Sequence, residues 1–493
     1  MLQLNHLLTE NAVLQAGKPH YVSGKTEPNC SIKLLFGNGK FEETSDSEGS
    51  FLFKVPAQPY NLETTLRIIS NDECIEIFVR YGDVFLFGGQ SNMDFRMENE
   101  DHFLEEQQEL AEEGLFFNNV PQVDYNDGKK QLPETIVEQS WQKLTKDNLK
   151  EMSAIAYYAT KEHRRKFPDR MIGVVNCSKG GTSASCWISE EYLVKSPAIT
   201  QDILSPYKEA IKGKDDEMLK TELANYWKQS EEFYKNREKI MREQPNLTLR
   251  EFKEQFGHSP WPPPANPYLF TRPSGLYQQM FKNIVPYTFS SVVWYQGEED
   301  TENSHLYYEL LHLLIKQWRK DLKEELPFYI VQLPVCKDRP GHDWPTVRQT
   351  QQQVAQEIDQ GYLITSLDCG EIDDIHPTEK SVLGQRIGEI IEGFHYKNCP
   401  TASLRSWTKN EVIIEIRETQ VIRSTDLHAI QGDQEINSIT IDRNRLIICS
   451  ESQLTNIYYA WNNASEVTLY NEIGYPVSPF YFEKNGNQQN ESI

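Results

Sequence analysis

Residues 82–93 read Gly-Asp-Val-Phe-Leu-Phe-Gly-Gly-Gln-Ser-Asn-Met, an apolar run that ends in two glycines and a polar turn. The run Val84–Gly88 has the length and composition of a buried β-strand. In open α/β sheets, ligands bind beyond the carboxyl ends of the strands. This stretch therefore predicts that Ser91 is exposed on a tight turn at such an edge, where a nucleophile could stand, although Gly and Ser also mark ordinary turns.

Further apolar runs alternate with segments of helical period, which is typical of a parallel α/β sheet. The other predicted strands are Ile172–Asn176, Ser291–Tyr295, Phe328–Leu333 and Tyr362–Leu367. The clearest helices begin at Ser304 and at about Thr378, and each has its apolar residues on one stripe. We therefore expect an α/β catalytic domain over residues 81–398.

The two ends of the chain carry a different pattern. Short apolar runs separated by turn residues predict a small β-sandwich over residues 1–80 and a β-rich domain over residues 399–493. Within the central domain, residues 195–258 are rich in Lys and Glu at helical spacing, which predicts a helical insertion. Its charged helices fit either a solvated face or a substrate lid.

The chain is strongly acidic. Its 493 residues include 50 Lys and Arg against 73 Asp and Glu, a formal net charge of -23. Such a charge repels phosphate backbones and anionic lipids, so we expect no nucleic-acid or membrane partner. The sequence also lacks an uninterrupted apolar run long enough for a membrane span.

Cysteine usage and the N-terminal residues bear on the cell compartment. The eight cysteines form no C-x-x-C pair, and the N-terminus lacks a basic stretch followed by an apolar run. These features favour reduced, buried thiols over disulfides or zinc, and a cytoplasmic location. They do not indicate an oligomeric state.

Two further predicted strands also end in polar turns. The second runs into Gly180 and Gly181, whose N–H groups could face an anion or form a structural turn. The third runs into Gln296, an amide that could donate to an oxyanion. The carboxylates of residues 298–300 could instead bind a metal with His305, but acidic loops often open helices because of the helix dipole.

A histidine turn, Asp373-Asp374-Ile375-His376-Pro377, follows the last predicted strand. A His can take the proton of a serine as general base, and a carboxylate can fix its tautomer and stabilise the imidazolium. An aspartate two or three residues earlier could reach the ring on a bend, although Asp-x-x-His also occurs as a helix cap. In a parallel sheet, Ser91 and His376 would meet at one edge.

In this order, the polar turns resemble those of the SGNH hydrolase superfamily, and more closely those of the sialate O-acetylesterase family of carbohydrate esterases. The resemblance covers nearly the whole chain, and residues 195–258 match least. The matching stretches are 82–93, 180–187, 272–280, 294–298, 348–351 and 374–384, with 10–15, 459–461, 469–471 and 479–480 near the ends.

The resemblance implies a flavodoxin-like three-layer α/β fold with flanking β-rich parts, and a serine esterase site. Ser91 would be the nucleophile and His376 the base. The N–H groups of Ser91 and Gly181, with the Gln296 side chain, would form the oxyanion hole, Gln296 standing where the superfamily usually has Asn. The triad acid would be Asp373 by the superfamily's Asp-x-x-His spacing, or Asp374 by the family's Asp-Ile-His-Pro string.

Other polar and aromatic residues on the same turns are expected to contact the substrate. The expected substrate-binding residues are Gln90, Asn92, Trp187, Glu298 and Arg348. Tryptophans near strand ends could stack on sugar rings or pack in the core; these are Trp187, Trp294 and Trp344.

We therefore expect a serine esterase that removes O-acetyl groups from a carbohydrate and needs no metal or organic cofactor. Sialic acid and hemicellulose or pectin oligosaccharides all fit as acetyl carriers. The alternatives are a non-catalytic carbohydrate-binding protein, suggested by the β-rich ends, and a lipase or thioesterase. The intact Ser, Gly, Gln and His set argues against the first, and the lack of an apparent apolar lid argues against the second.

Overall fold

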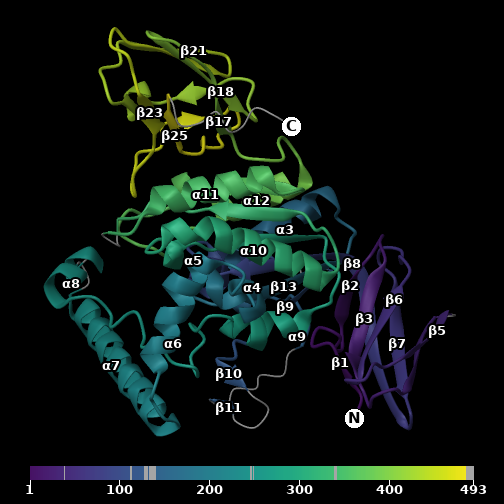
Figure 1. Ribbon diagram of the computed structural model, residues 1–493. Helices are drawn as coiled ribbons and strands as arrows, with labels where there is room; N and C mark the ends of the chain where they lie inside the picture. Colours follow the sequence, from purple (N-terminus) through teal and green to yellow (C-terminus); the bar gives the residue numbers. More distant parts are fainter. Residues whose placement is uncertain are drawn as a thin grey trace.

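A mixed β-sheet runs through the centre of the protein, with helices packed around it (Figure 1). The computed structural model describes residues 1–37, 39–111, 114–126, 131–132, 140–244, 247, 249–337 and 341–484. The central strands stand in the order β12-β9-β13-β8-β14-β15-β16, and only β12 is antiparallel to its neighbour. They are β12 Gln142–Lys143, β9 Leu115–Asn119, β13 Ile172–Ser178, β8 Glu73–Gly89, β14 Ser291–Tyr295, β15 Phe328–Gln332 and β16 Gly361–Thr365.

The five strands predicted for the central domain are all present. β14 has the predicted bounds, and β13, β15 and β16 differ from the prediction only at their ends. Strand β9 was not predicted, because its short sequence Leu-Phe-Phe-Asn-Asn ends in two residues that are depleted in strands. The carboxyl ends of the parallel strands therefore meet at one edge, as the sequence predicted.

Strand β8 connects the N-terminal part to the central sheet. Its first half pairs with β7 (Glu63–Ser70) and β2 (Ala12–Gln15), and its second half pairs with β13 and β14. The predicted boundary at residue 80 thus lies inside one continuous strand. The remaining N-terminal strands are β1 Gln3–Leu4, β3 His20–Lys25, β4 Ser31–Phe36, β5 Gly39–Thr44 and β6 Ser50–Val55.

Helices of the central domain pack in pairs. α12 (Ser381–Glu392) lies against α3 (Ala154–Lys166), and α10 (Ser304–Leu322) lies against α11 (Trp344–Glu357). The apolar stripe predicted for α10 is buried. Helix α3 was not predicted. Shorter helices are α1 Ser91–Asp94, α2 Phe103–Glu109, α4 Glu190–Leu193 and α9 Lys282–Ile284.

The charge-rich segment after α4 is helical, as predicted. It contains α5 (Pro197–Ile199), α6 (Ser205–Ile211), α7 (Asp216–Glu243) and α8 (Leu249–Phe256). Helices α7 and α8 project away from the central sheet (Figure 1). Only Leu219, Tyr226 and Ser230 of α7 are buried, so most of this long helix is a solvated surface.

The C-terminal strands have a hydrophobic core of their own, separate from that of the rest of the chain. One sheet has the order β17-β18-β22-β21 and another the order β20-β23-β25. The strands are β17 Thr401–Trp407, β18 Glu411–Arg417, β20 Ile430–Gly432, β21 Ser438–Asp442, β22 Arg445–Cys449, β23 Asn456–Tyr459 and β25 Phe480–Glu483. Two-stranded pairs are formed by β19 Arg423–Ser424 with β24 Leu469–Tyr470, and by β10 Tyr125–Asn126 with β11 Gln131–Leu132.

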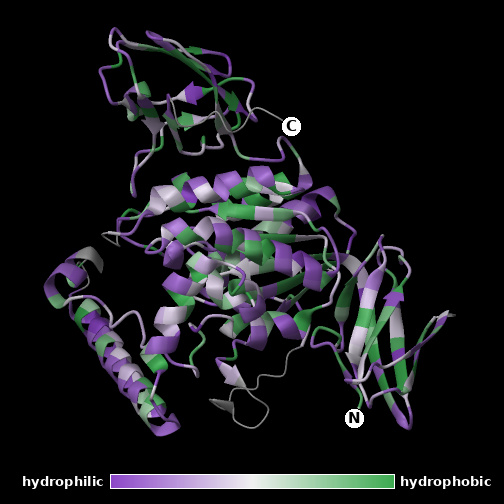
Figure 2. Ribbon diagram, viewed as in Figure 1, coloured by the Kyte–Doolittle hydropathy of each residue, from purple (hydrophilic) through white to green (hydrophobic). Residues whose placement is uncertain are grey.

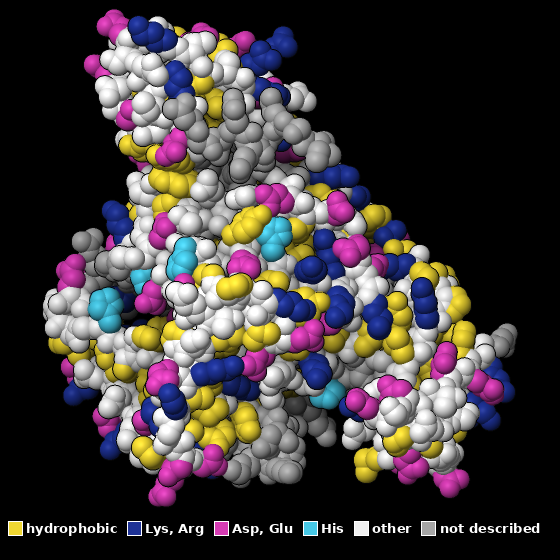
Figure 3. Space-filling model, in the orientation of Figure 1, with side chains coloured by type: hydrophobic (Ala, Val, Ile, Leu, Met, Phe, Trp, Pro, Cys, Tyr) yellow, Lys and Arg dark blue, Asp and Glu magenta, His cyan; other side chains and the backbone are white. Residues whose placement is uncertain are grey.

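Hydrophobic and charged residues are distributed differently. Hydrophobic positions are concentrated in the central strands (Figure 2), whereas Lys and Arg are interspersed with Asp and Glu over the face shown in Figure 3. Among the described helices, none combines the length and apolar character needed to cross a bilayer. All eight cysteines are free thiols, and four of them are buried.

Candidate active site

Ser91 stands where β8 passes into the short helix α1, at the carboxyl edge of the sheet. The turn depends on Gly89, whose φ is +145° and whose missing Cβ would lie 2.0 Å from the carbonyl oxygen of Tyr295. Only glycine allows this close approach of two backbones. Ser91 lies on the predicted turn and is half-buried.

The structure brings Ser91 and His376 together. Oγ of Ser91 lies 2.7 Å from Nε2 of His376, although the two residues are 285 positions apart in the sequence. His376 stands on the loop between β16 and α12, so the fold places both residues at the same edge of the sheet. At this distance the hydroxyl can donate its proton directly to the imidazole.

The two candidate acids lie on the turn of His376. Oδ1 of Asp374 accepts the backbone N–H of His376 at 2.9 Å. This hydrogen bond stabilises the turn that carries His376. Asp373 precedes it on the same loop.

Gly180 and Gly181 form the neighbouring turn, after β13. A Cβ on Gly180 would lie 3.2 Å from Cβ of Ser91, so this turn passes directly beside Ser91. Gly181 has a φ of +68°, which favours glycine. Within the described part of the chain, the N–H groups of Ser91 and Gly181 donate to no acceptor. Both donors are therefore available to an anion beside Ser91.

Gln296, predicted to contribute to the oxyanion hole, lies at the end of β14. An amide nitrogen carries two hydrogens, and Nε2 of Gln296 is within hydrogen-bonding distance of Thr182 O at 2.9 Å and Asp300 Oδ2 at 2.5 Å. Gln296 is fully buried. Its amide group therefore connects the end of β14 to the residues that follow Gly181.

Asp300 adds further hydrogen bonds to this connection between β14 and the residues after Gly181. Its carboxylate accepts the hydroxyl of Ser183 at 2.6 Å and the backbone N–H of Ala184 at 2.8 Å. Burial raises the pKa of Asp300 to about 6. The hydrogen bonds favour its charged form and offset part of that effect.

The structure places the five residues predicted to bind substrate inside the protein, where they contact other parts of the chain. Each has at most 2% of its surface exposed: Gln90, Asn92, Trp187, Glu298 and Arg348. Oε1 of Gln90 accepts the N–H groups of Gly297 and Glu299. Asn92 donates to Glu298 Oε1 at 2.7 Å. These side chains hold the catalytic turns in place.

Arg348 has a structural role at the junction with the C-terminal part. Its guanidinium donates to the backbone carbonyls of Leu333, Pro334, Asn462 and Asn463. These carbonyls accept four of the five N–H donors of a fully buried side chain, and burial lowers the pKa of Arg348 to about 9. Arg348 therefore connects the loop after β15 to the turn that follows β23 in the C-terminal part.

The tryptophans proposed for sugar stacking are also in the core. Trp187, Trp294 and Trp344 are fully buried, and Trp187 packs edge-on against Trp294 and Trp318. A tryptophan that the sequence did not single out, Trp261, lies at the site instead.

Trp261 is half-buried and packs over the Gly181 turn. A Cβ on Gly181 would lie only 2.5 Å from its ring, and its Nε1 donates to Glu299 Oε1 at 3.0 Å. The Trp-Pro-Pro-Pro run at 261–264 marks a rigid loop, but nothing in the sequence shows which turn that loop covers.

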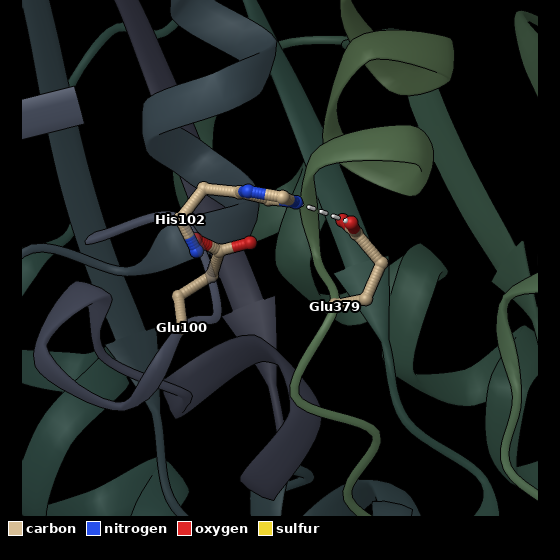
Figure 4. A group of neighbouring side chains, drawn as sticks. All are labelled: Glu100, His102 and Glu379. Carbon is tan, nitrogen blue, oxygen red and sulfur yellow. Dashed lines mark hydrogen bonds and ion pairs between the residues drawn. The ribbon is translucent and has the colours of Figure 1, made fainter. Parts of the chain in front are cut away.

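The alternative metal site is not formed. His305 is 62% exposed and contacts Asp202 at 3.1 Å, whereas Glu298 and Asp300 are buried. Among the described residues, three potential ligand groups approach one another only at Glu100, His102 and Glu379 (Figure 4).

Hydrogen bonds account for the group in Figure 4. Oε2 of Glu100 accepts the hydroxyl of Tyr158 at 2.9 Å and the backbone N–H of His102 at 2.7 Å. Nε2 of His102 lies 2.9 Å from Glu379 Oε2, and this bond raises the pKa of His102. The group links the loop after α1 to the start of α12.

Comparisons with known proteins identify the family of this chain and a shared fold. The family model described as carbohydrate esterase, sialic acid-specific acetylesterase, matches residues 81–248 and 266–391. A carbohydrate acetylesterase from Xanthomonas citri has a TM-score of 0.73 at 22% identity, with 98% of this chain and 100% of that chain covered. This likeness shows a shared fold.

Two other solved structures are more distant. A protein from Arabidopsis thaliana has a TM-score of 0.32 at 14% identity, covering 63% of this chain and 98% of its own. A family two carbohydrate esterase from Clostridium thermocellum, in complex with cellohexaose, has a TM-score of 0.28 at 9% identity, covering 77% and 90%. No curated protein matches the sequence. Because the family model spans more than half of the chain, this protein belongs to the sialic acid-specific acetylesterase family of carbohydrate esterases.

Proposed function

We propose that the protein is a serine esterase that removes O-acetyl groups from a carbohydrate, with O-acetylated sialic acid as its substrate. The observation that carries the proposal is the 2.7 Å contact between Ser91 Oγ and His376 Nε2. It lies at the carboxyl edge of the sheet, in a member of a carbohydrate esterase family. The five parallel strands β13-β8-β14-β15-β16 stand in the order 2-1-3-4-5 when β9, which pairs beyond β13, is left out of the count, and this order supports an SGNH-like layered fold.

The reaction begins with the transfer of the Ser91 proton to Nε2 of His376. Oγ attacks the acetyl carbonyl, and the negative oxygen that forms is stabilised by the N–H groups of Ser91 and Gly181, which have no acceptor in the described chain. His376 then gives the proton to the departing sugar hydroxyl. A water molecule attacks the acetyl-enzyme through the same base and releases acetate.

We assign the triad acid to Asp373. The carboxylate of Asp374 already accepts the backbone N–H of His376, so we assign Asp374 the role of stabilising the turn. The acid orients the imidazole and stabilises its protonated form. This mechanism uses no metal or organic cofactor.

The proposal is tested by acetate release from matched substrates. Acetylated sialic acid should be hydrolysed faster than acetylated xylo- or manno-oligosaccharides, and a fluorophosphonate should label Ser91 and abolish the activity. Exhaustive EDTA treatment should leave the rate unchanged. Loss of activity on chelation that a divalent ion restores, without labelling of Ser91, would refute the serine mechanism. A preference for the neutral oligosaccharides would instead identify a hemicellulose acetylesterase.

We further propose that the sugar ring packs on Trp261, because this half-buried indole covers the turn beside the nucleophile. Trp261→Ala should lower kcat/KM on the acetylated sugar by about tenfold, the equivalent of roughly 1.4 kcal/mol of stacking. Vinyl acetate has no ring to stack, so its hydrolysis should change little. Trp261→Phe should keep most of the sugar activity. An equal loss on both esters would show that Trp261 supports the Gly181 turn and does not bind sugar.

A further inference from the structure

A buried network begins at Asn92, the residue that follows the nucleophile. Asn92 is fully buried, and its amide nitrogen donates to Glu298 Oε1 at 2.7 Å and to the carbonyl oxygen of Ile375 at 3.0 Å. Ile375 immediately precedes His376. One side chain therefore joins the turn that carries the nucleophile to the turn that carries the base.

Lys380 completes this network at the start of α12. Its Nζ donates to Oδ1 of Asn92 at 2.8 Å, and only 1% of the residue is exposed. An ammonium group can only donate hydrogen bonds. The amide oxygen of Asn92 must therefore face Lys380, and its N–H groups must face Glu298 and Ile375. Without the cation, the amide oxygen loses its donor, and only the two acceptors of its nitrogen still orient the side chain.

A buried ammonium is costly unless its surroundings compensate its charge. Nζ of Lys380 lies 4.7 Å from the centre of the Phe95 ring, and its backbone N–H donates to Glu100 Oε1 at 3.4 Å. The titratable groups that face Lys380 from the surrounding elements are Glu298, Glu371, Asp374, Cys369 and Glu100 with its partner Tyr158. Burial nevertheless lowers the pKa of Lys380 to about 8. Lys380 therefore keeps its proton at neutral pH and loses it as the pH rises through that value.

We propose that Lys380 is a positioning residue of the esterase: its ammonium orients Asn92, and Asn92 holds the His376 turn at hydrogen-bonding distance from Ser91. This inference rests on the proposed function, because it assigns the residue to that same site. Lys380 is buried behind the catalytic turns and is not placed to touch substrate. Its loss should therefore change kcat more than KM.

The test compares Lys380→Met and Lys380→Arg with the wild type on an aryl acetate. Because a displacement of about 1 Å at a reacting group can cost on the order of a hundredfold, Lys380→Met should lower kcat by roughly 10- to 100-fold with little change in KM. Lys380→Arg should recover part of the loss, since it keeps the cation. Wild-type kcat should fall as the pH rises through about 8, whereas Lys380→Arg should hold its rate to higher pH because a guanidinium stays charged.

Glu379→Gln is the matched control on the neighbouring residue. Its carboxylate bonds His102 at the exposed end of the group in Figure 4, so kcat and its pH dependence should stay as in the wild type. An active wild type, together with a Lys380→Met variant of unchanged kcat, would overturn this inference alone. If Lys380→Met does not fold, a wild-type rate that stays level well above pH 8 overturns it. A wild type that neither hydrolyses acetate esters nor reacts with a fluorophosphonate would overturn the proposed function and this inference together.

Discussion

Replacing Ser91 with alanine should lower turnover on an acetate ester by at least about a thousandfold, because the members of a catalytic triad act as a unit. The protein should still fold, since the substitution removes one hydroxyl from a half-buried turn and leaves Gly89 and the strand pairing of β8 untouched. The measurement is kcat on an aryl acetate, with the melting temperature as a check of folding.

A serine far from the sheet edge provides the control for this substitution. Ser205 is exposed at the start of α6, where its hydroxyl donates to the carbonyl oxygen of Thr200 at 2.8 Å. Ser205→Ala should keep full activity and should still be labelled by a fluorophosphonate, whereas Ser91→Ala should lose both. A folded Ser91→Ala variant that keeps a tenth of the wild-type rate would remove Ser91 from the role of nucleophile.

The sequence predicted the positions of Ser91 and His376 because strand ends can be read locally. Each follows an apolar run bounded by glycines or polar residues, and the carboxyl ends of parallel strands share one edge. That rule predicts that two residues 285 positions apart share one edge of the sheet, and the structure adds the 2.7 Å distance between their side chains.

The residues around the pair could not be assigned in the same way. A polar side chain at a strand end can face a ligand or an internal partner, and the partner is often distant in sequence. Arg348 donates to carbonyls 114 and 115 residues away, and Asn92 reaches Lys380 288 residues away. Trp261 was missed for the same reason, because its position over Gly181 depends on a loop that local pattern does not place.

Helix α3 shows a related limit for the fold. Its sequence begins Ala-Ile-Ala-Tyr-Tyr-Ala and is buried over most of two turns, so no polar face marks its period there. The stripe of α10, by contrast, is read easily because charged residues separate its apolar positions. Amphipathic helices on the surface of the domain are therefore predicted from sequence more readily than helices whose first turns are buried.

The second large effect on kcat is expected from removing the triad acid, and a matched pair of variants can show which aspartate it is. Asp373→Asn should lower kcat on the order of a thousandfold to ten-thousandfold, because an amide in that position stabilises the wrong tautomer of the histidine and cannot support the imidazolium. Asp374→Asn should lower kcat by less than about tenfold. An asparagine oxygen can still accept the backbone N–H of His376 and keep the turn, because Asn and Asp are nearly equivalent as caps. Both variants change one carboxylate to an amide of the same shape on the same loop, so each is the control for the other. The opposite ranking would give the role to Asp374, and two variants that both retain near wild-type kcat would show that His376 works without an aspartate from this turn.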